Sequence, residues 1–254
     1  MASSRKRPSG ELVAEVGRFL GSIDLRGKRL AVGLSGGVDS VVLLHVLKQH
    51  PELSLSAIHV HHGLSRNAGA WARFCRALCA RWGVPLAVRR VKVAKKGKGL
   101  EAAAREARYR AFRDSPCDAV ALAHNRDDQA ETVLMNLLRG AGVRGASGMP
   151  PRGRLDGRML LRPLLEVPRV AILAYAREQG LEWVEDESNA DEALTRNFVR
   201  RRLGPLIESR FPRWRESLAR AARHFAGVGL DAQALLREFL AAQGLRAPSE
   251  AKLV

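Results

Sequence analysis

The chain has 254 residues, and its 43 Lys and Arg outnumber its 26 Asp and Glu to give a net charge of +17. This excess predicts a polyanionic partner, most simply a nucleic acid, although an Arg-rich proteome would also produce it. No apolar run is long enough to cross a bilayer, and three cysteines cannot build a disulfide framework. A membrane protein and a disulfide-rich secreted protein are therefore excluded, and a cytoplasmic protein is expected.

Strand-like and helix-like segments alternate from the start of the chain, which predicts an α/β fold with a doubly wound, mostly parallel sheet. Helices are expected at about 12–20, 38–47, 68–82, 100–109, 128–138 and 167–179, and strands at about 30–32, 55–61, 86–93, 119–123 and 159–161. Residues 140–157 are rich in Gly, Arg and Pro and are expected to form a long loop, which in compact domains is usually functional or mobile.

From about Thr195 the alternation stops, and the rest of the chain has a helical pattern. A composition shift near 208–212 predicts a domain at 1–208, followed at 209–254 by a helical linker and the start of an incomplete C-terminal domain. A long helix is expected from Trp214 into the 230s, and Ser249 has the pattern of a further helix start. The chain thus reads as truncated or as a naturally short form. Its one low-complexity patch is at Lys95–Lys98.

A turn of small residues lies between the first predicted strand and the helix that follows it. Adjacent glycines let the backbone approach a ligand and turn its N–H groups inward. With two hydroxyls and the positive end of the helix, these amides predict a polyphosphate cradle. A Walker loop is excluded because its lysine is absent. The cradle consists of Ser35, Gly36, Gly37, Val38, Asp39 and Ser40.

This Ser-Gly-Gly-x-Asp-Ser turn resembles the pyrophosphate loop of the N-type ATP pyrophosphatases. The resemblance implies an adenine nucleotide alpha hydrolase-like fold. It also implies ATP as a substrate that is cleaved between its α and β phosphates, with adenylation of a carbonyl oxygen. Mg²⁺ is the implied cofactor, and Asp39 is the residue expected to hold it through ATP.

A second group of polar residues, 124–132, opens a helix after the fourth strand. Asp128 and Glu131 are three residues apart and share a helix face with Thr132. Carboxylates that face a polyphosphate require Mg²⁺ between them or a bound cationic nucleophile. Capping alone would explain Asp127. Because ligands bind beyond the carboxyl ends of parallel strands, this group should lie beside the cradle and the turn at His61 and His62.

Several stretches beyond the loop resemble the tRNA(Ile)-lysidine synthetase family, over about residues 29–212. They are 100–109, 124–132, 138–140, 145–149, 162–165, 185–189 and 196–200. The resemblance implies that lysine is ligated to the wobble cytidine of the CAU-anticodon isoleucine tRNA through an adenylated cytidine, giving lysidine, AMP and pyrophosphate. Together with the polar positions described above, the resemblance implies catalytic roles for Asp39, Asp128, Glu131 and Arg196. It implies substrate contacts for His61, His62, His124, Asp127, Thr132, Arg139, Asn197 and Arg200.

A basic run predicts where RNA would bind. Arg196 and Arg200–Arg202 are expected on one helix, followed by Arg210, Arg213 and Arg215. A solvated helix face is the ordinary interpretation of such a run. Acids that could pair it are scarce nearby in sequence, which favours contact with phosphates. Further candidates for the tRNA path are Arg139, Arg144, Arg152 and Arg154.

Two alternatives remain open from the sequence: a tRNA thiolase with the same loop, and a non-catalytic basic RNA-binding protein. A thiolase would need its cysteines, but the spacing of Cys75 and Cys79 favours helix packing. A zinc site at His59, His61 and His62 is disfavoured because no Cys or carboxylate lies nearby in sequence. The oligomeric state is open, with a dimer among the options.

Overall fold

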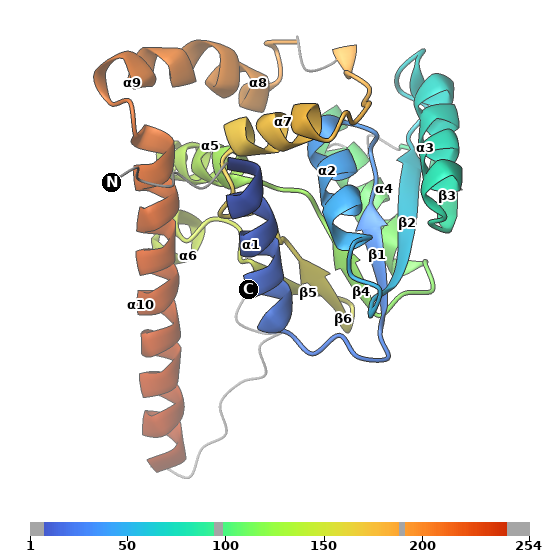
Figure 1. Ribbon diagram of the computed structural model, residues 1–254. Coiled ribbons are helices and arrows are strands. Elements are labelled where there is room, and N and C mark those ends of the chain that lie inside the picture. Colours follow the sequence, from blue (N-terminus) through green and yellow to red (C-terminus); the bar gives the residue numbers. More distant parts are fainter. Residues whose placement is uncertain (1–7, 94–98, 188–190, 243–254) are drawn as a thin grey trace, which may run out of the picture.

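The computed structural model describes residues 8–93, 99–187 and 191–242 (Figure 1). Four features singled out in the sequence therefore lie outside the described residues: the patch at Lys95–Lys98, Ser188, Asn189 and the helix start at Ser249. No helix within the described ranges is both long and apolar enough to pass through a membrane.

The centre of the fold is a six-stranded sheet with the order β3-β2-β1-β4-β6-β5. Its strands are β1 (Arg29–Gly33), β2 (Ser54–His61), β3 (Leu86–Arg90), β4 (Ala119–Ala121), β5 (Arg152–Leu155) and β6 (Arg158–Leu161). All neighbouring pairs are parallel except β5 with β6. The predicted doubly wound, mostly parallel sheet is thus confirmed.

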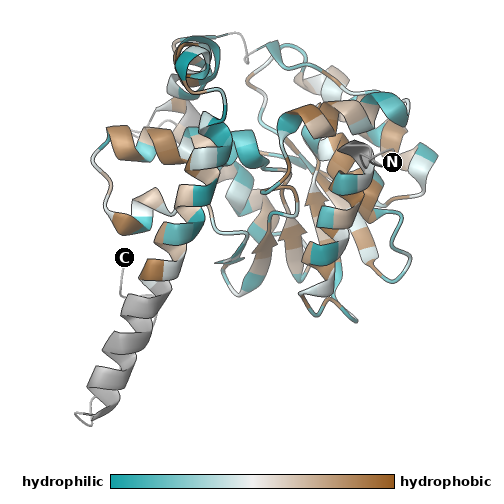
Figure 2. Cartoon of the chain, turned by 60° about the vertical axis from the view of Figure 1, so that its left-hand side comes forward, coloured by the Kyte–Doolittle hydropathy of each residue, from teal (hydrophilic) through white to brown (hydrophobic). Residues whose placement is uncertain are grey.

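Side chains along each strand face alternate sides of the sheet, and this divides the hydrophobic core into two layers. Leu30 and Val32 of β1 pack into a core that also holds side chains of α1 (Pro8–Gly21), α2 (Val38–Leu47), α3 (Ala68–Trp82) and α7 (Arg169–Glu178). Ala31 faces the opposite layer, where it joins Phe112 of α4 (Leu100–Arg113). Successive strand residues point to opposite faces, so a strand that is apolar throughout is covered on both sides. In Figure 2 the strands are accordingly brown between the two helical layers.

The prediction that residues 140–157 form one long loop is wrong in part. The structure has a short helix α6 (Val143–Ala146) and the strand β5 within it. Asp156 and Gly157 both have positive φ, of 46° and 81°, and turn β5 back onto β6. An Asp-Gly pair is a strong hairpin signal, so this turn was readable from the sequence. Gln129 also fixes the segment, because its side-chain amide exchanges hydrogen bonds with the backbone of Met149.

The C-terminal part of the chain is helical, as predicted. It consists of α8 (Thr195–Phe198), a π-helical turn at Val199–Leu203, α9 (Gly204–Arg210) and α10 (Trp214–Ala242). The long helix α10 packs along α5 (Arg126–Leu138) and α6 (Figure 1). The predicted domain boundary at 208/209 falls inside α9 and remains a prediction.

Candidate active site

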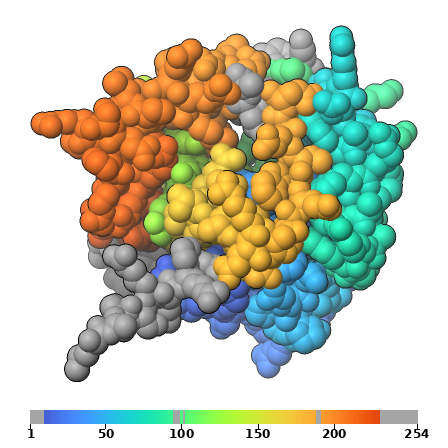
Figure 3. Space-filling model, turned by 45° about the horizontal axis from the view of Figure 1, so that its top comes forward, coloured from blue at the N-terminus to red at the C-terminus, as the bar shows by residue number. Residues whose placement is uncertain are grey.

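Three strand-to-helix connections meet at the carboxyl edge of the sheet, as the topology predicted. They border a cavity of about 650 Å³. The polar side chains around it include Ser35, Asp39, Ser40, His61, His62, Arg105, Arg108, Tyr109, His124, Asp186, Glu187 and Asp191. Figure 3 looks onto this edge, where the surface is hollowed beside the segments coloured yellow to orange.

The serine–glycine loop is shaped by its own hydroxyls. The Ser40 Oγ accepts the backbone N–H groups of Ser35 and Gly36, each at 3.2 Å, and donates to the Gly37 carbonyl at 2.9 Å. Gly36 has φ +95°, and a Cβ there would lie 2.9 Å from Cγ2 of Val184. Only glycine fits this position without strain, so the loop between β1 and α2 has a fixed path under the segment that contains Val184.

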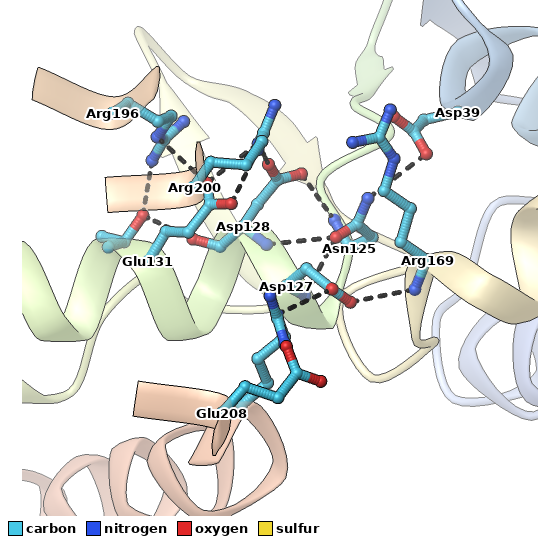
Figure 4. Close-up of polar contacts among 11 residues, drawn as sticks. Asp39, Asn125, Asp127, Asp128, Glu131, Arg169, Arg196, Arg200 and Glu208 are labelled. Carbon is cyan, nitrogen blue, oxygen red and sulfur yellow. Dashed lines mark hydrogen bonds and ion pairs between the residues drawn. The ribbon is translucent and has the colours of Figure 1, made fainter. Parts of the chain in front are cut away.

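Asp39 lies in the first turn of α2 and lines the cavity. Its carboxylate accepts a hydrogen bond from Nδ2 of Asn125 at 3.2 Å (Figure 4). Burial, followed by the nearby charge of Asp128, raises the pKa of Asp39 to about 6. The positive charges of Arg169 and Arg200 lower the pKa of Asp39 but do not cancel the effect of burial and Asp128. A carboxylate whose charge is only partly compensated is suited to a bound cation.

The start of α5 is capped by Asn125 and not by Asp127. The Asn125 side chain accepts the N–H groups of Asp127 and Asp128, while Asp128 Oδ2 accepts the Asn125 N–H at 3.1 Å. Asp127 lies in the first turn of α5, where the helix dipole favours an acid, but the N-cap itself is Asn125. The carboxylate of Asp127 accepts the Arg169 backbone N–H at 2.9 Å and pairs with Arg215 at 3.2 Å. Asp127 thus joins α5 to α7 and α10.

Glu131 is at the centre of an acid–arginine cluster (Figure 4). Arg200 holds it with two hydrogen bonds, Nε to Oε1 at 2.8 Å and Nη2 to Oε2 at 2.9 Å, and also donates to Asp128 Oδ1 at 3.1 Å. Arg196 lies 3.7 Å from Glu131 and donates to Thr132 Oγ1 at 2.7 Å. Burial raises the pKa of Glu131, whose side chain is only 3% exposed, and the bonds from Arg200 oppose that rise.

The expectation that the basic run has no acidic partners is therefore wrong. Its acids come from elsewhere in the chain: Arg200 pairs with Asp128 and Glu131, Arg201 and Arg202 with Glu192, Arg213 with Glu216, and Arg215 with Asp127 and Glu208. The pairs with Asp127, Asp128 and Glu131 join residues that are distant in sequence, so local composition could not reveal them. The pairs with Glu192, Glu208 and Glu216 join residues within ten positions of each other. The run is also interrupted by the π-helical turn that carries Arg200.

Two more predicted contacts lie outside the cavity lining. Asn197 is 7% exposed and donates through Nδ2 to the Asp191 carbonyl at 2.8 Å, so it holds its own segment in place. Arg139 is the exposed C-terminal cap of α5. The 13 residues of α5 span about 20 Å, which separates Arg139 from the acids at the start of this helix.

His62 and His124 of the cavity are neutral at physiological pH. Burial, reinforced by nearby arginines, lowers the pKa of His62 to about 4 and that of His124 to about 3. Their Nδ1 atoms are buried and make no hydrogen bond within the described structure. No three His, Cys, Asp or Glu side chains of the described residues gather into a metal-binding group.

Sequence reasoning missed three cavity residues on α4, namely Arg105, Arg108 and Tyr109. Their spacing of three and four places them on one face of a helix, and that pattern was readable from the sequence. Trp71 on α3 was also missed. Nothing in its sequence context distinguishes it from an ordinary packing residue.

The cysteines are packed in the interior. Burial raises the pKa of Cys75 to about 12 and that of Cys79 to about 11, and it also raises the pKa of Cys117. Cys75 Sγ lies 3.4 Å from Nδ1 of the buried His59. A thiolate is therefore disfavoured at all three positions, which agrees with the packing interpretation of Cys75 and Cys79.

The mostly parallel sheet has, at its carboxyl edge, a loop suited to bind a polyphosphate, and a carboxylate with a raised pKa lies beside this loop. These features define an α/β protein of the phosphate-binding class. Residues 9–207 match the PP-loop domain family, and the chain belongs to that family.

Among curated proteins, a tRNA(Ile)-lysidine synthase of Chromobacterium violaceum is 50% identical over 82% of this chain and 48% of its own length. A tRNA(Ile)-lysidine synthase of Nitrosomonas europaea is 47% identical over 87% of this chain and 52% of its own length. The chain thus spans about half the length of the curated relatives it matches. A solved U34-tRNA thiolase of Methanococcus maripaludis, with its [4Fe-4S] cluster, superposes with a TM-score of 0.71 over 87% of this chain and 80% of its own. That structure is 20% identical in sequence, so the likeness concerns the fold alone.

Proposed function

We propose that the chain carries the catalytic part of a tRNA(Ile)-lysidine synthase. Its substrates would be ATP, free L-lysine and the isoleucine tRNA with a CAU anticodon. The observation that carries the proposal is the 50% identity to a protein of that name, within which the Ser35–Ser40 loop and the acids of α5 lie at one sheet edge. We place the adenylation domain at residues 1–208, and the cell compartment is the cytoplasm, where tRNA is used.

In the first step, the cytosine carbonyl oxygen attacks the α-phosphorus of ATP, and the bond to the pyrophosphate oxygen breaks. The departing pyrophosphate gathers negative charge, which the positive N-terminus of α2 and the backbone amides of the loop stabilise. The Ser35 and Ser40 hydroxyls now hold those amides, so they exchange partners when the triphosphate binds.

Mg²⁺ is the cofactor proposed for this step, and Asp39 is the residue that would hold it together with the ATP phosphates. The fit is good because Asp39 is a half-buried carboxylate on the cavity wall whose pKa is raised to about 6. A bound Mg²⁺ would supply charge neutralisation at the phosphates.

In the second step, the lysine amine attacks the activated ring carbon, and AMP leaves with the bonding electrons. The amine must arrive as an ammonium ion and lose protons. Asp128 and Glu131 are suited to both tasks, because a carboxylate can hold an ammonium ion and accept a proton from it. Burial raises the pKa of Glu131. Arg200 occupies these acids in the structure, so the ammonium ion displaces it or shares them with it.

The test is incubation of the chain with the CAU-anticodon tRNA, ATP and labelled lysine. Label on the RNA, with one pyrophosphate released per lysine, supports the proposal. Release of pyrophosphate without label when all substrates are present would contradict the assigned acceptor.

The two alternatives predict different results. A thiolase would lose activity in a Cys75→Ala, Cys79→Ala double variant, whereas a lysidine synthase would keep it. A non-catalytic RNA-binding protein would release no pyrophosphate at all. The raised thiol pKa values of Cys75 and Cys79 weigh against the thiolase.

A further inference from the structure

An acid-free stretch of sequence lies outside the basic run considered above. Between Glu52 and Glu101 the chain has no Asp or Glu, but it has ten Lys and Arg. Seven of these cations are exposed in the described structure. Arg81 pairs with Glu182 at 2.9 Å, and we call the other six the basic rim. They are Arg66, Arg73, Arg76, Arg89, Arg90 and Lys92.

The topology places the basic rim at the mouth of the cavity. β3 pairs in parallel with β2, and the register puts Arg90 beside His61, which lines the cavity. Helix α3 starts at the same edge, so Arg73 and Arg76 lie in its first half. Arg76 is close enough to contribute to the lowered pKa of His59, another cavity residue. Figure 1 places α3 and β3 on the side of the sheet away from α10.

The arginines of the rim differ from many of the arginines elsewhere in the protein, and they are clustered in an acid-free stretch of sequence. Arg18 pairs with Glu15, Arg26 with Asp24, Arg110 with Glu106 and Arg113 with Asp156, and the run from Arg196 is paired as described. By contrast, no ion pair or hydrogen bond to the side chain of a rim residue is found within the described structure. Some other exposed arginines likewise show no ion pair or hydrogen bond within the described structure, namely Arg139, Arg154, Arg177, Arg210 and Arg220. Glu187, which lines the cavity, accepts hydrogen bonds from Ser65 and Asn67.

Clustered, unpaired cations repel each other and make no contribution to the fold that the structure reveals. A polyanion would remove that repulsion and release its own counterions. We infer that the basic rim binds the phosphate backbone of RNA, so that the RNA reaches the cavity from the α3–β3 side. This inference rests on the proposed function for the identity of the RNA, and it goes beyond it by assigning the surface.

The extent of the rim favours RNA over a small phosphate compound. Its residues come from the segment before α3, from α3 itself, and from the end of β3 and the residues after it, so a single nucleotide cannot touch them all. ATP has its own place at the Ser35–Ser40 loop. The exposed residues of the size of Leu or Phe that the described structure shows in this stretch are Leu64 and Leu100, which both line the cavity. Binding to a lipid surface normally combines basic side chains with a larger apolar face.

The experiment compares two quadruple variants of the chain that remove the same charge. The rim variant carries R73Q, R76Q, R89Q and R90Q. The control carries R18Q, R26Q, R110Q and R113Q, whose arginines are ion-paired. Binding of the CAU-anticodon tRNA transcript is measured from 50 to 300 mM NaCl. Circular dichroism checks the fold of both proteins.

For the rim variant we expect the slope of log affinity against log salt to fall by about 3, because each lost phosphate contact removes about 0.7–0.9. The control should lose less than about 1. Equal slopes in the two variants would overturn the inference. So would unchanged RNA binding together with lost binding to phosphatidylserine vesicles. Because RNA binding is measured without turnover, failure of lysine incorporation alone would refute the proposed function and leave the rim assignment intact.

Discussion

At the scale of single residues, Asp39 combines two opposed properties. Its position at the start of α2 favours a negative charge, but burial and the nearby Asp128 raise its pKa to about 6. The folded protein therefore holds a proton on Asp39 over a pH range in which the unfolded chain has already lost it. Such a carboxylate is unfavourable for folding at neutral pH, which is expected where a function requires it.

Replacement of Asp39 by Asn should separate stability from activity. Since the folded state binds the proton more tightly, the stabilising effect of protonated Asp39 is full below pH 3.8 and is lost as the pH rises through about 6. The Asp39→Asn variant cannot ionise at this position, so it does not lose stability as the pH rises. At pH 7 its free energy of unfolding should therefore exceed that of the original chain by about 1–2 kcal/mol. Urea unfolding at pH 4.5 and 7 measures the difference.

The same variant should release no pyrophosphate. Turnover at the original rate would show that Asp39 does not serve the polyphosphate site, whatever the outcome for stability.

The acids of α5 give a second test at this scale. If Asp128 and Glu131 hold the lysine amine, Asp128→Asn and Glu131→Gln should slow lysine transfer about 10²–10⁴-fold while adenylation continues. Adenylated tRNA should then accumulate, which a quench experiment with labelled ATP detects. A parallel loss of both steps, relieved by added Mg²⁺, would instead place these acids on the metal.

At the scale of elements, the sequence predicted what depends on local periodicity. The bounds of α2 and α3 agree with the predicted 38–47 and 68–82. Helix α2 follows two glycines and is apolar on nearly all sides, whereas α3 starts with small residues and has one apolar face. The pairing of Arg200 with Glu131 was not predictable, because it joins residues 69 positions apart. The partners of Asp127 were not predictable for the same reason: Arg169 and Arg215 come from other helices.

The loop that joins β1 to α2 is the element with the strictest backbone requirement. Gly36→Ala would place a methyl group at a positive φ and 2.9 Å from Val184, so the loop must shift. We expect a loss of stability of about 1–3 kcal/mol and a large loss of pyrophosphate release. Gly27→Ala is the matched control, because Gly27 has φ +67° and nothing within 4 Å of the new Cβ. It should lose about 1–2 kcal/mol and keep its activity. Equal activity losses would mean that the close approach to Val184 is unimportant.

At the scale of the whole molecule, α10 joins the C-terminal part of the chain to α5 and to the segment before α7. Arg215 at its start pairs with Asp127 on α5, and Arg223 pairs with Glu166 before α7. Ala219 and Ala222 are each 1% exposed on the face of α10 that is buried. The helix that follows the predicted boundary at 208/209 is therefore packed on the helix that carries Asp128 and Glu131. We therefore expect changes in the C-terminal part to affect the site through this contact.

Substitution on the two faces of α10 tests whether the helix and the site form one unit. Ala222→Glu buries a carboxylate against the rest of the protein and should lower the free energy of unfolding by about 2–4 kcal/mol. Ala226→Glu makes the same change on the exposed face and should cost less than about 0.5 kcal/mol. Since α5 loses its support in the first variant, its pyrophosphate release should fall as well, while the second keeps full activity. Thermal unfolding followed by circular dichroism, and pyrophosphate release below the transition, measure both effects. A destabilised Ala222→Glu protein with full activity would show that α10 folds onto the site without supporting it, and would favour residues 209–254 as a separate unit.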